Sequence, residues 1–171
     1  MPIEKFIAIK SNQQVPCDVY IKMYLPNEIE EDKDKRFPLL IESSEIDQHN
    51  VWKRFDLDWG KYLASKKQII YAKMDCIRTR SSSSSMGSAG AAAGGYQTAG
   101  SSLDDDQTLM NSSPLFNAKD QVDAIKFMAD NVDLFPYIDR RRIAILGPNS
   151  AAAYVALATT INDDSKLIQC T

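Results

Sequence analysis

Residues 141–154, RRIAILGPNSAAAY, join an apolar run to a second apolar segment through Gly147 and Pro148. Residues 142–147 contain an apolar run, which is typical of a strand buried in a parallel sheet. Pro148 interrupts this run, because proline cannot continue a paired strand. Residues 150–161 are apolar almost all round, so we expect a helix in the centre of the core. The stretch therefore predicts a buried strand, a sharp turn and a closely packed helix.

The rest of the chain alternates between strand and helix patterns. Two amino-terminal segments alternate apolar and polar residues and predict an antiparallel pair, and the later apolar runs predict buried strands. The predicted strands are 4–9, 17–25, 37–41, 68–74, 142–147 and 167–171, and the predicted helices are 51–65, 118–131 and 150–161. This order predicts an α/β fold with a mostly parallel sheet, helices on both faces and an antiparallel leading pair.

The two earlier helices each carry an apolar stripe at helical spacing, which we expect to face the core. The expected core residues are Val51, Phe55, Trp59, Tyr62 and Leu63 in the first helix, and Val122, Ile125, Phe127, Met128 and Val132 along the second.

Two segments lack such patterns. Residues 27–36 are charged and predict a solvated connection. Residues 79–113 are of low complexity, with serine, glycine and alanine dominating, and this composition predicts a mobile loop. The acidic run of residues 104–106 within it predicts a solvated turn more than a cation site.

Composition excludes several classes of protein. Twenty Lys and Arg against 23 Asp and Glu give a net charge of −3, which argues against a nucleic-acid partner. No apolar run reaches the roughly 18 residues of a membrane helix, and the amino terminus lacks a signal-peptide pattern. Three cysteines at distant positions, with His49 as the sole histidine, predict neither a metal site nor a cofactor.

Several motifs in a shared order resemble the dipeptidyl-peptidase branch of the prolyl-oligopeptidase-type serine peptidases. Residues 35–40 are similar to the family's K-Y-P-L-L strand, and residues 58–65 to its N-W-x-x-Y-L-A-S helix. Three further motifs of the family have counterparts here: G-Y-Q at residues 95–97, E-D-Q-x-E-A at 119–124 and D-x-x-R-I-A-I at 139–145. The resemblance implies that residues 1–171 form the amino-terminal half of an α/β-hydrolase catalytic domain, an incomplete one whose sheet is cut at the chain's end.

Members of this family cleave peptides near proline with a Ser-Asp-His triad, and their serine lies in G-W-S-Y-G-G-Y. Here the corresponding stretch is one residue longer. Counted from Gly147 the nucleophile position holds Asn149, which has no usable nucleophile; counted from Tyr154 it holds Ser150. Ser150 is therefore a candidate nucleophile, and its alternative role is a helix N-cap.

The resemblance also implies a tyrosine that stabilises the oxyanion after the third strand. Ser44 stands near its place, and Glu42 and Glu45 are expected to oppose a developing negative charge there. The family's catalytic Asp and His would lie beyond Thr171, and we expect His49 to be a solvated loop residue.

From these losses we expect a catalytically inactive, peptidase-like segment that acts in binding or as an accessory subunit. The resemblance implies peptides or a membrane protein as partner, a homodimer through the hydrolase domain, and, in a longer parent chain, the extracellular side of the plasma membrane. Two alternatives stay open: an active serine-type dipeptidyl peptidase, if a longer chain supplies Asp and His, and a non-functional gene fragment.

Overall fold

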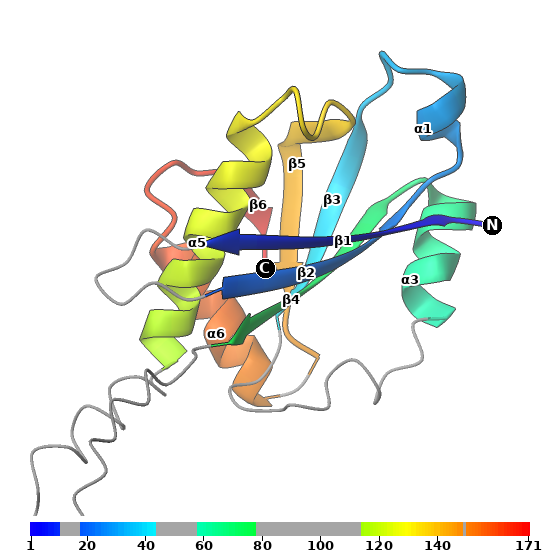
Figure 1. Cartoon of the computed structure of the whole chain (residues 1–171). Helices are drawn as coiled ribbons and strands as arrows, with labels where there is room; N and C mark the ends of the chain where they lie inside the picture. Colours follow the sequence, from blue (N-terminus) through cyan, green and yellow to red (C-terminus); the bar gives the residue numbers. More distant parts are fainter. Residues whose placement is uncertain (11–17, 44–57, 78–113, 149) are drawn as a thin grey trace, which may run out of the picture.

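The computed structural model describes residues 1–10, 18–43, 58–77, 114–148 and 150–171, which form one six-stranded sheet with helices on both faces (Figure 1). The strands lie side by side in the order β1-β2-β4-β3-β5-β6. Their bounds are β1 Ile3–Lys10, β2 Asp18–Leu25, β3 Phe37–Ser43, β4 Ile70–Ile77, β5 Ile138–Leu146 and β6 Ile168–Cys170.

The predicted α/β architecture is confirmed. Strands β3, β4, β5 and β6 pair in parallel, whereas β1 pairs with β2, and β2 with β4, in antiparallel fashion. Because parallel strands end at the same edge of a sheet, the carboxyl ends of β3 and β5 lie together. This edge is where the predicted turn after β5 is found.

Two helices pack on one face of the sheet and a shorter helical segment packs on the other (Figure 1). Helices α5 (Pro114–Asp130) and α6 (Ser150–Ile161) cover the larger core, which contains Ile41, Met74 and Ile143. Helix α3 (Asp58–Tyr62) continues into the π-helical turn η1 (Leu63–Lys67) over the smaller core of Tyr24, Leu63, Ala64 and Tyr71. None of the described helices is both long enough and apolar enough to cross a membrane.

Several details of the sequence prediction are wrong. The charged connection at 27–36 contains a short helix, α1 (Glu28–Glu31). Trp59 and Tyr62 do not face the core, because their side chains stay 59% and 45% exposed and stack on each other with ring centroids 5.8 Å apart. Gly60 faces the sheet instead, since a Cβ there would lie 2.5 Å from the Tyr71 ring and 2.9 Å from the Tyr24 ring. Val51 and Phe55 lie outside the described residues.

The apolar stripes of the later helices also differ from expectation. Val122, Ile125 and Met128 are buried, but Phe127 and Val132 are exposed. Helix α6 is not enclosed on all sides, because Tyr154, Leu157 and Ile161 form an exposed stripe along it at positions i, i+3 and i+7. The low-complexity region 79–113 lies outside the described residues.

Asp139 stabilises the start of β5 through hydrogen bonds with two arginines. It accepts hydrogen bonds from the backbone N–H of Arg141 (2.9 Å) and from Nε of Arg142 (2.6 Å), while Arg142 Nη2 also donates to the carbonyl of Arg36 (3.1 Å). Partial burial acts to raise the pKa of Asp139, but these hydrogen bonds and the two arginine charges outweigh it and hold the pKa below its usual range.

We expect Asp139→Asn to lower the free energy of unfolding at neutral pH. The loss should stay at or below about 1 kcal/mol, because the ion pair of Asp139 with Arg142 is partly exposed. The pKa of the Asp139 carboxyl is lower in the folded chain than in the unfolded chain. The carboxylate therefore stabilises the fold at pH values above the unfolded-state pKa, and this stabilisation is lost as the pH falls through the folded-state pKa. Urea unfolding should therefore show a difference between variant and parent at neutral pH that disappears in acid. Asp133→Asn, at an exposed aspartate of the connection that precedes β5, is the control, and an equal loss there would contradict the assignment.

Candidate functional site

The turn between β5 and α6 brings strand and helix into close approach at Gly147. Strand β5 ends at Leu146 and α6 begins at Ser150, so the connection is short. A Cβ at position 147 would overlap the backbone of Ala152 and Ala153. Only glycine therefore fits this position, because any side chain there would overlap the backbone of α6.

Ser150 is the first residue of α6, and its side chain is exposed. Because the helix begins at Ser150, the position that precedes the helix is residue 149, which lies outside the described residues. Ser44 and His49 also lie outside them. Among the predicted site residues, the structure thus places Ser150 alone, at the amino end of α6.

A buried polar cluster connects the end of β3 to helices α5 and α6. Gln121 Nε2 of α5 donates to Ser43 Oγ at the end of β3 (3.1 Å), and Thr159 Oγ1 of α6 lies 3.2 Å from Gln121 Oε1. All three side chains are buried. Buried polar groups that satisfy one another fix the relative positions of the elements that carry them. The cluster therefore sets α6, and with it Ser150, relative to the end of β3.

A second buried cluster lies on the opposite face of the same strand end. Lys73 Nζ of β4 pairs with Glu42 Oε1 of β3 at 2.9 Å, and the hydroxyl of Tyr71 donates to Glu42 Oε2. Burial and the Glu42 carboxylate raise the pKa of Tyr71 above its usual range, so its hydroxyl keeps its proton.

The Glu42 carboxylate is therefore paired with a cation, while its predicted opposition to a developing negative charge stays a prediction. The adjacent ammonium of Lys73 compensates the carboxylate, and register explains why, since Glu42 and Lys73 are directly opposite in the parallel pair. Sequence reasoning missed both clusters; the available signals were a lysine inside the apolar run of β4 and polar residues on the buried sides of α5 and α6.

In the described ranges, no group of three or more His, Cys, Asp or Glu side chains is arranged to hold a metal ion. The chemistry that this part of the chain offers is a hydroxyl at the amino end of a helix, close to the carboxyl ends of parallel strands.

Comparison with known proteins places the chain by its fold. No family model matches the sequence, and no curated protein matches it. Among solved structures, dipeptidyl peptidase 4 of Porphyromonas gingivalis matches 98% of the chain at 21% identity, with a TM-score of 0.61. An esterase of the fungus Rhizomucor miehei matches 97% at 14% identity (TM-score 0.57), and the isopeptidase AtxE2 matches 96% at 15% identity (TM-score 0.56).

The chain spans only part of these proteins, 20% of the peptidase, 40% of the esterase and 22% of the isopeptidase. At these identities the likeness concerns the fold. The mostly parallel six-stranded sheet, its antiparallel leading pair and its flanking helices agree with it. The chain therefore has the α/β-hydrolase fold that serine peptidases and esterases share.

Proposed function

We propose that this chain is a peptidase-like hydrolase segment whose nucleophile has been lost, and that it acts in binding rather than in catalysis. The observation that carries the proposal is the contact of Gly147 with the backbone of Ala152 and Ala153. In the pattern G-x-S-x-G the glycines allow helix and strand to approach, and the serine stands two residues after the first glycine.

Counting from Gly147 places Asn149 at the position of the nucleophile. An amide does not attack a carbonyl carbon as an activated hydroxyl does. Ser150 is displaced by one residue and begins the helix. The rigid placement of α6 by the buried Ser43, Gln121 and Thr159 cluster supports this reading, because it opposes a shift of the helix by one residue.

The ordered motifs and the likeness to dipeptidyl peptidase 4 support the dipeptidyl-peptidase branch as the origin of the segment. Within this proposal the partner is a peptide or a membrane protein, held without cleavage. The second candidate is an active serine-type dipeptidyl peptidase, favoured by the exposure of Ser150 at the amino end of α6, a helix of 12 residues. It requires an Asp and a His from a longer chain.

A fluorophosphonate probe, which labels activated serines, tests the proposal. Because the second candidate needs an Asp and a His from a longer chain, that candidate is tested with the same variants in a longer chain that contains residues 1–171. We expect the full 171-residue chain to label only at background level, equally in the parent, in Ser150→Ala and in the control Ser165→Ala, which changes an exposed serine after α6. Hydrolysis of a glycyl-prolyl chromogenic substrate should be equally absent.

Labelling of the parent and of Ser165→Ala that disappears in Ser150→Ala would establish Ser150 as a nucleophile and overturn the proposal. Thermal unfolding followed by circular dichroism shows that the labelled sample is folded. A cooperative transition also counts against a non-functional fragment.

A further inference from the structure

A surface hollow of the described chain combines an apolar lining with several positive charges. It has a volume of about 390 Å³ and lies where the connection after α5 meets the starts of β3 and β5. Its apolar lining consists of Ala129, Val132, Phe135 and Ile138. Three arginines, Arg36, Arg140 and Arg141, also line this arginine-lined hollow. Because β5 runs from the hollow to the turn at Gly147, the hollow lies at the opposite edge of the sheet from Ser150 (Figure 1).

The three arginines have charge to offer a ligand. Arg141 forms no ion pair within the described ranges, although its backbone N–H donates to Asp139. Arg140 pairs with Asp130 at 2.9 Å, but both side chains are more than half exposed, so another carboxylate can replace this weak contact. Arg36 donates from Nη1 to two backbone carbonyls of the preceding connection (3.1 and 3.3 Å), which orients its guanidinium without using the other N–H groups.

Asp139 also lines the hollow, and its negative charge is already compensated. Its carboxylate accepts hydrogen bonds from Nε of Arg142 at 2.6 Å and from the backbone N–H of Arg141 at 2.9 Å. With Arg142 and Asp130 included, four arginines and two aspartates line the hollow or pair with its lining, which leaves an excess of two positive charges. The hollow is therefore positive, although the whole chain has a net charge of −3.

Hydrogen bonds hold the walls of the hollow in place. Asn131 follows α5, and its Nδ2 donates to the carbonyl of Phe127 (2.7 Å). The backbone N–H of Phe135 donates to the carbonyl of Asn131 (2.9 Å), and that of Phe37 donates to the carbonyl of Tyr137 (2.8 Å). A ligand therefore does not lose affinity to the ordering of these walls.

We infer that the arginine-lined hollow binds an acidic segment of another protein, with one large apolar side chain of that segment against the apolar lining. Burial of the apolar side chain contributes affinity, and guanidinium groups bind carboxylates through charge-assisted, often bidentate hydrogen bonds. The apolar lining favours such a segment over a nucleic acid, whose backbone presents charge without apolar side chains. The inference does not rest on the proposed function, since it stands whether or not Ser150 is a nucleophile.

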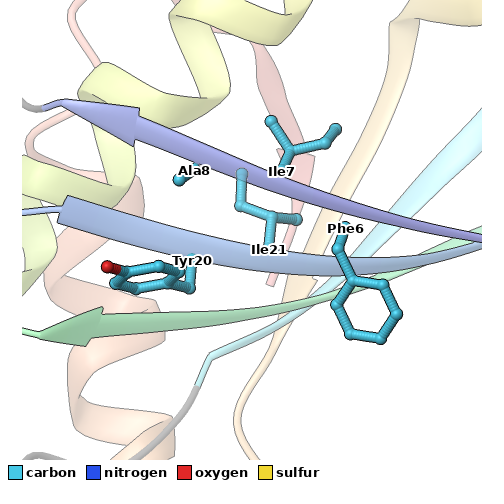
Figure 2. A pocket seen from close by; sticks show the side chains of 5 residues that line it. All are labelled: Phe6, Ile7, Ala8, Tyr20 and Ile21. Carbon is cyan, nitrogen blue, oxygen red and sulfur yellow. The ribbon is translucent and has the colours of Figure 1, made fainter.

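A second hollow, between β1 and β2, offers apolar contact alone (Figure 2). It is lined by Phe6, Ile7, Ala8, Tyr20 and Ile21, none of which is charged. Beside it, Glu4 of β1 already pairs with Lys22 of β2 at 3.3 Å. This second hollow is therefore a matched control for the arginine-lined one.

Fluorescence anisotropy of a labelled peptide tests the inference on the 171-residue chain. The probe is the amidated pentapeptide EDLDE. We expect it to bind with an affinity that falls as salt is added, because exposed charge pairs are screened. The peptide EDGDE lacks the apolar side chain and QNLNQ lacks the carboxylates, so each should bind at least about tenfold more weakly.

Variants of the chain assign the binding to the hollow. Arg141→Ala should weaken the binding of EDLDE at least about fivefold, and Val132→Asp should weaken it more, because it places a carboxylate at the apolar lining. Circular dichroism checks that both variants are folded. Lys66→Ala removes an exposed positive charge from η1, and Phe6→Ser changes the second hollow, so both should bind like the parent.

The results that would overturn the inference are an EDLDE peptide that does not bind, a QNLNQ peptide that binds equally well, or an Arg141→Ala chain that binds like its parent. Displacement of EDLDE by an oligothymidine would assign the positive charge to nucleic acid and would also overturn it. A parent chain that dimerises in light scattering, and is monomeric as Arg141→Ala, would assign the hollow to a second copy instead.

Discussion

Lys73→Met is expected to lower the free energy of unfolding by about 3–5 kcal/mol, because it leaves a buried carboxylate without its cation. Lys73 is 3% exposed and Glu42 is 8% exposed, so water cannot replace the lost ammonium. Methionine keeps most of the volume of lysine, and the loss should therefore report the charge more than a cavity. Urea unfolding followed by circular dichroism measures the change.

The double variant Glu42→Gln/Lys73→Met is the decisive companion. Glutamine is uncharged and keeps an oxygen to accept the hydrogen bond of Tyr71, so most of the lost stability should return. Equal midpoints for the single variant and its parent would show that the ion pair contributes nothing. A double variant less stable than the single one would assign the loss to packing instead.

Gly147→Ala is the second large effect that we expect. The added methyl group would overlap main-chain atoms of Ala152 and Ala153, which cannot rotate away as a side chain can. Either α6 moves from β5 or the turn rearranges, and we expect a loss of about 3 kcal/mol, at the upper end of overpacking effects. The same unfolding measurement detects it.

Pro148→Ala is the matched control, because it changes the neighbouring turn residue, whose side chain is exposed. Its effect should stay below about 1 kcal/mol and arise mainly in the unfolded chain. An unchanged midpoint for Gly147→Ala would mean that the turn is loose. The proposed position of Asn149 at the nucleophile site would then lose its support.

The strands and their succession along the chain could be predicted from the sequence, because buried strands have apolar or alternating residue patterns. The alternating residues of β1 indicate a strand with one solvated face. The apolar runs of β3 to β5 indicate strands buried on both faces. The orientation of α3 could not be predicted, since an aromatic pair such as Trp59 and Tyr62 fits a buried apolar stripe and also an exposed stack. Gly60, which lies between them in the sequence, sets the orientation of the helix, because only a residue without a side chain fits against the Tyr71 ring.

The site was only partly predictable, for a different physical reason. The strand–turn–helix around Gly147 is local, so its residues are adjacent in the sequence. The pairing of Glu42 with Lys73 depends on the register of two strands, and the contact of Gln121 with Ser43 joins residues 78 positions apart. Neither can be seen in the sequence before the arrangement of the sheet is known.

The buried cluster of Ser43, Gln121 and Thr159 has a consequence for how the molecule opens. Opening α5 would break the hydrogen bonds of Gln121 with Ser43 and Thr159, and opening α6 would break its contact with Thr159. The two helices are therefore energetically linked. Helices α5 and α6 and the end of β3 therefore form one cooperative unit, whose amide protons exchange with solvent together. Among the described strands β1 pairs with β2 alone, so we expect it to open before the centre of the sheet.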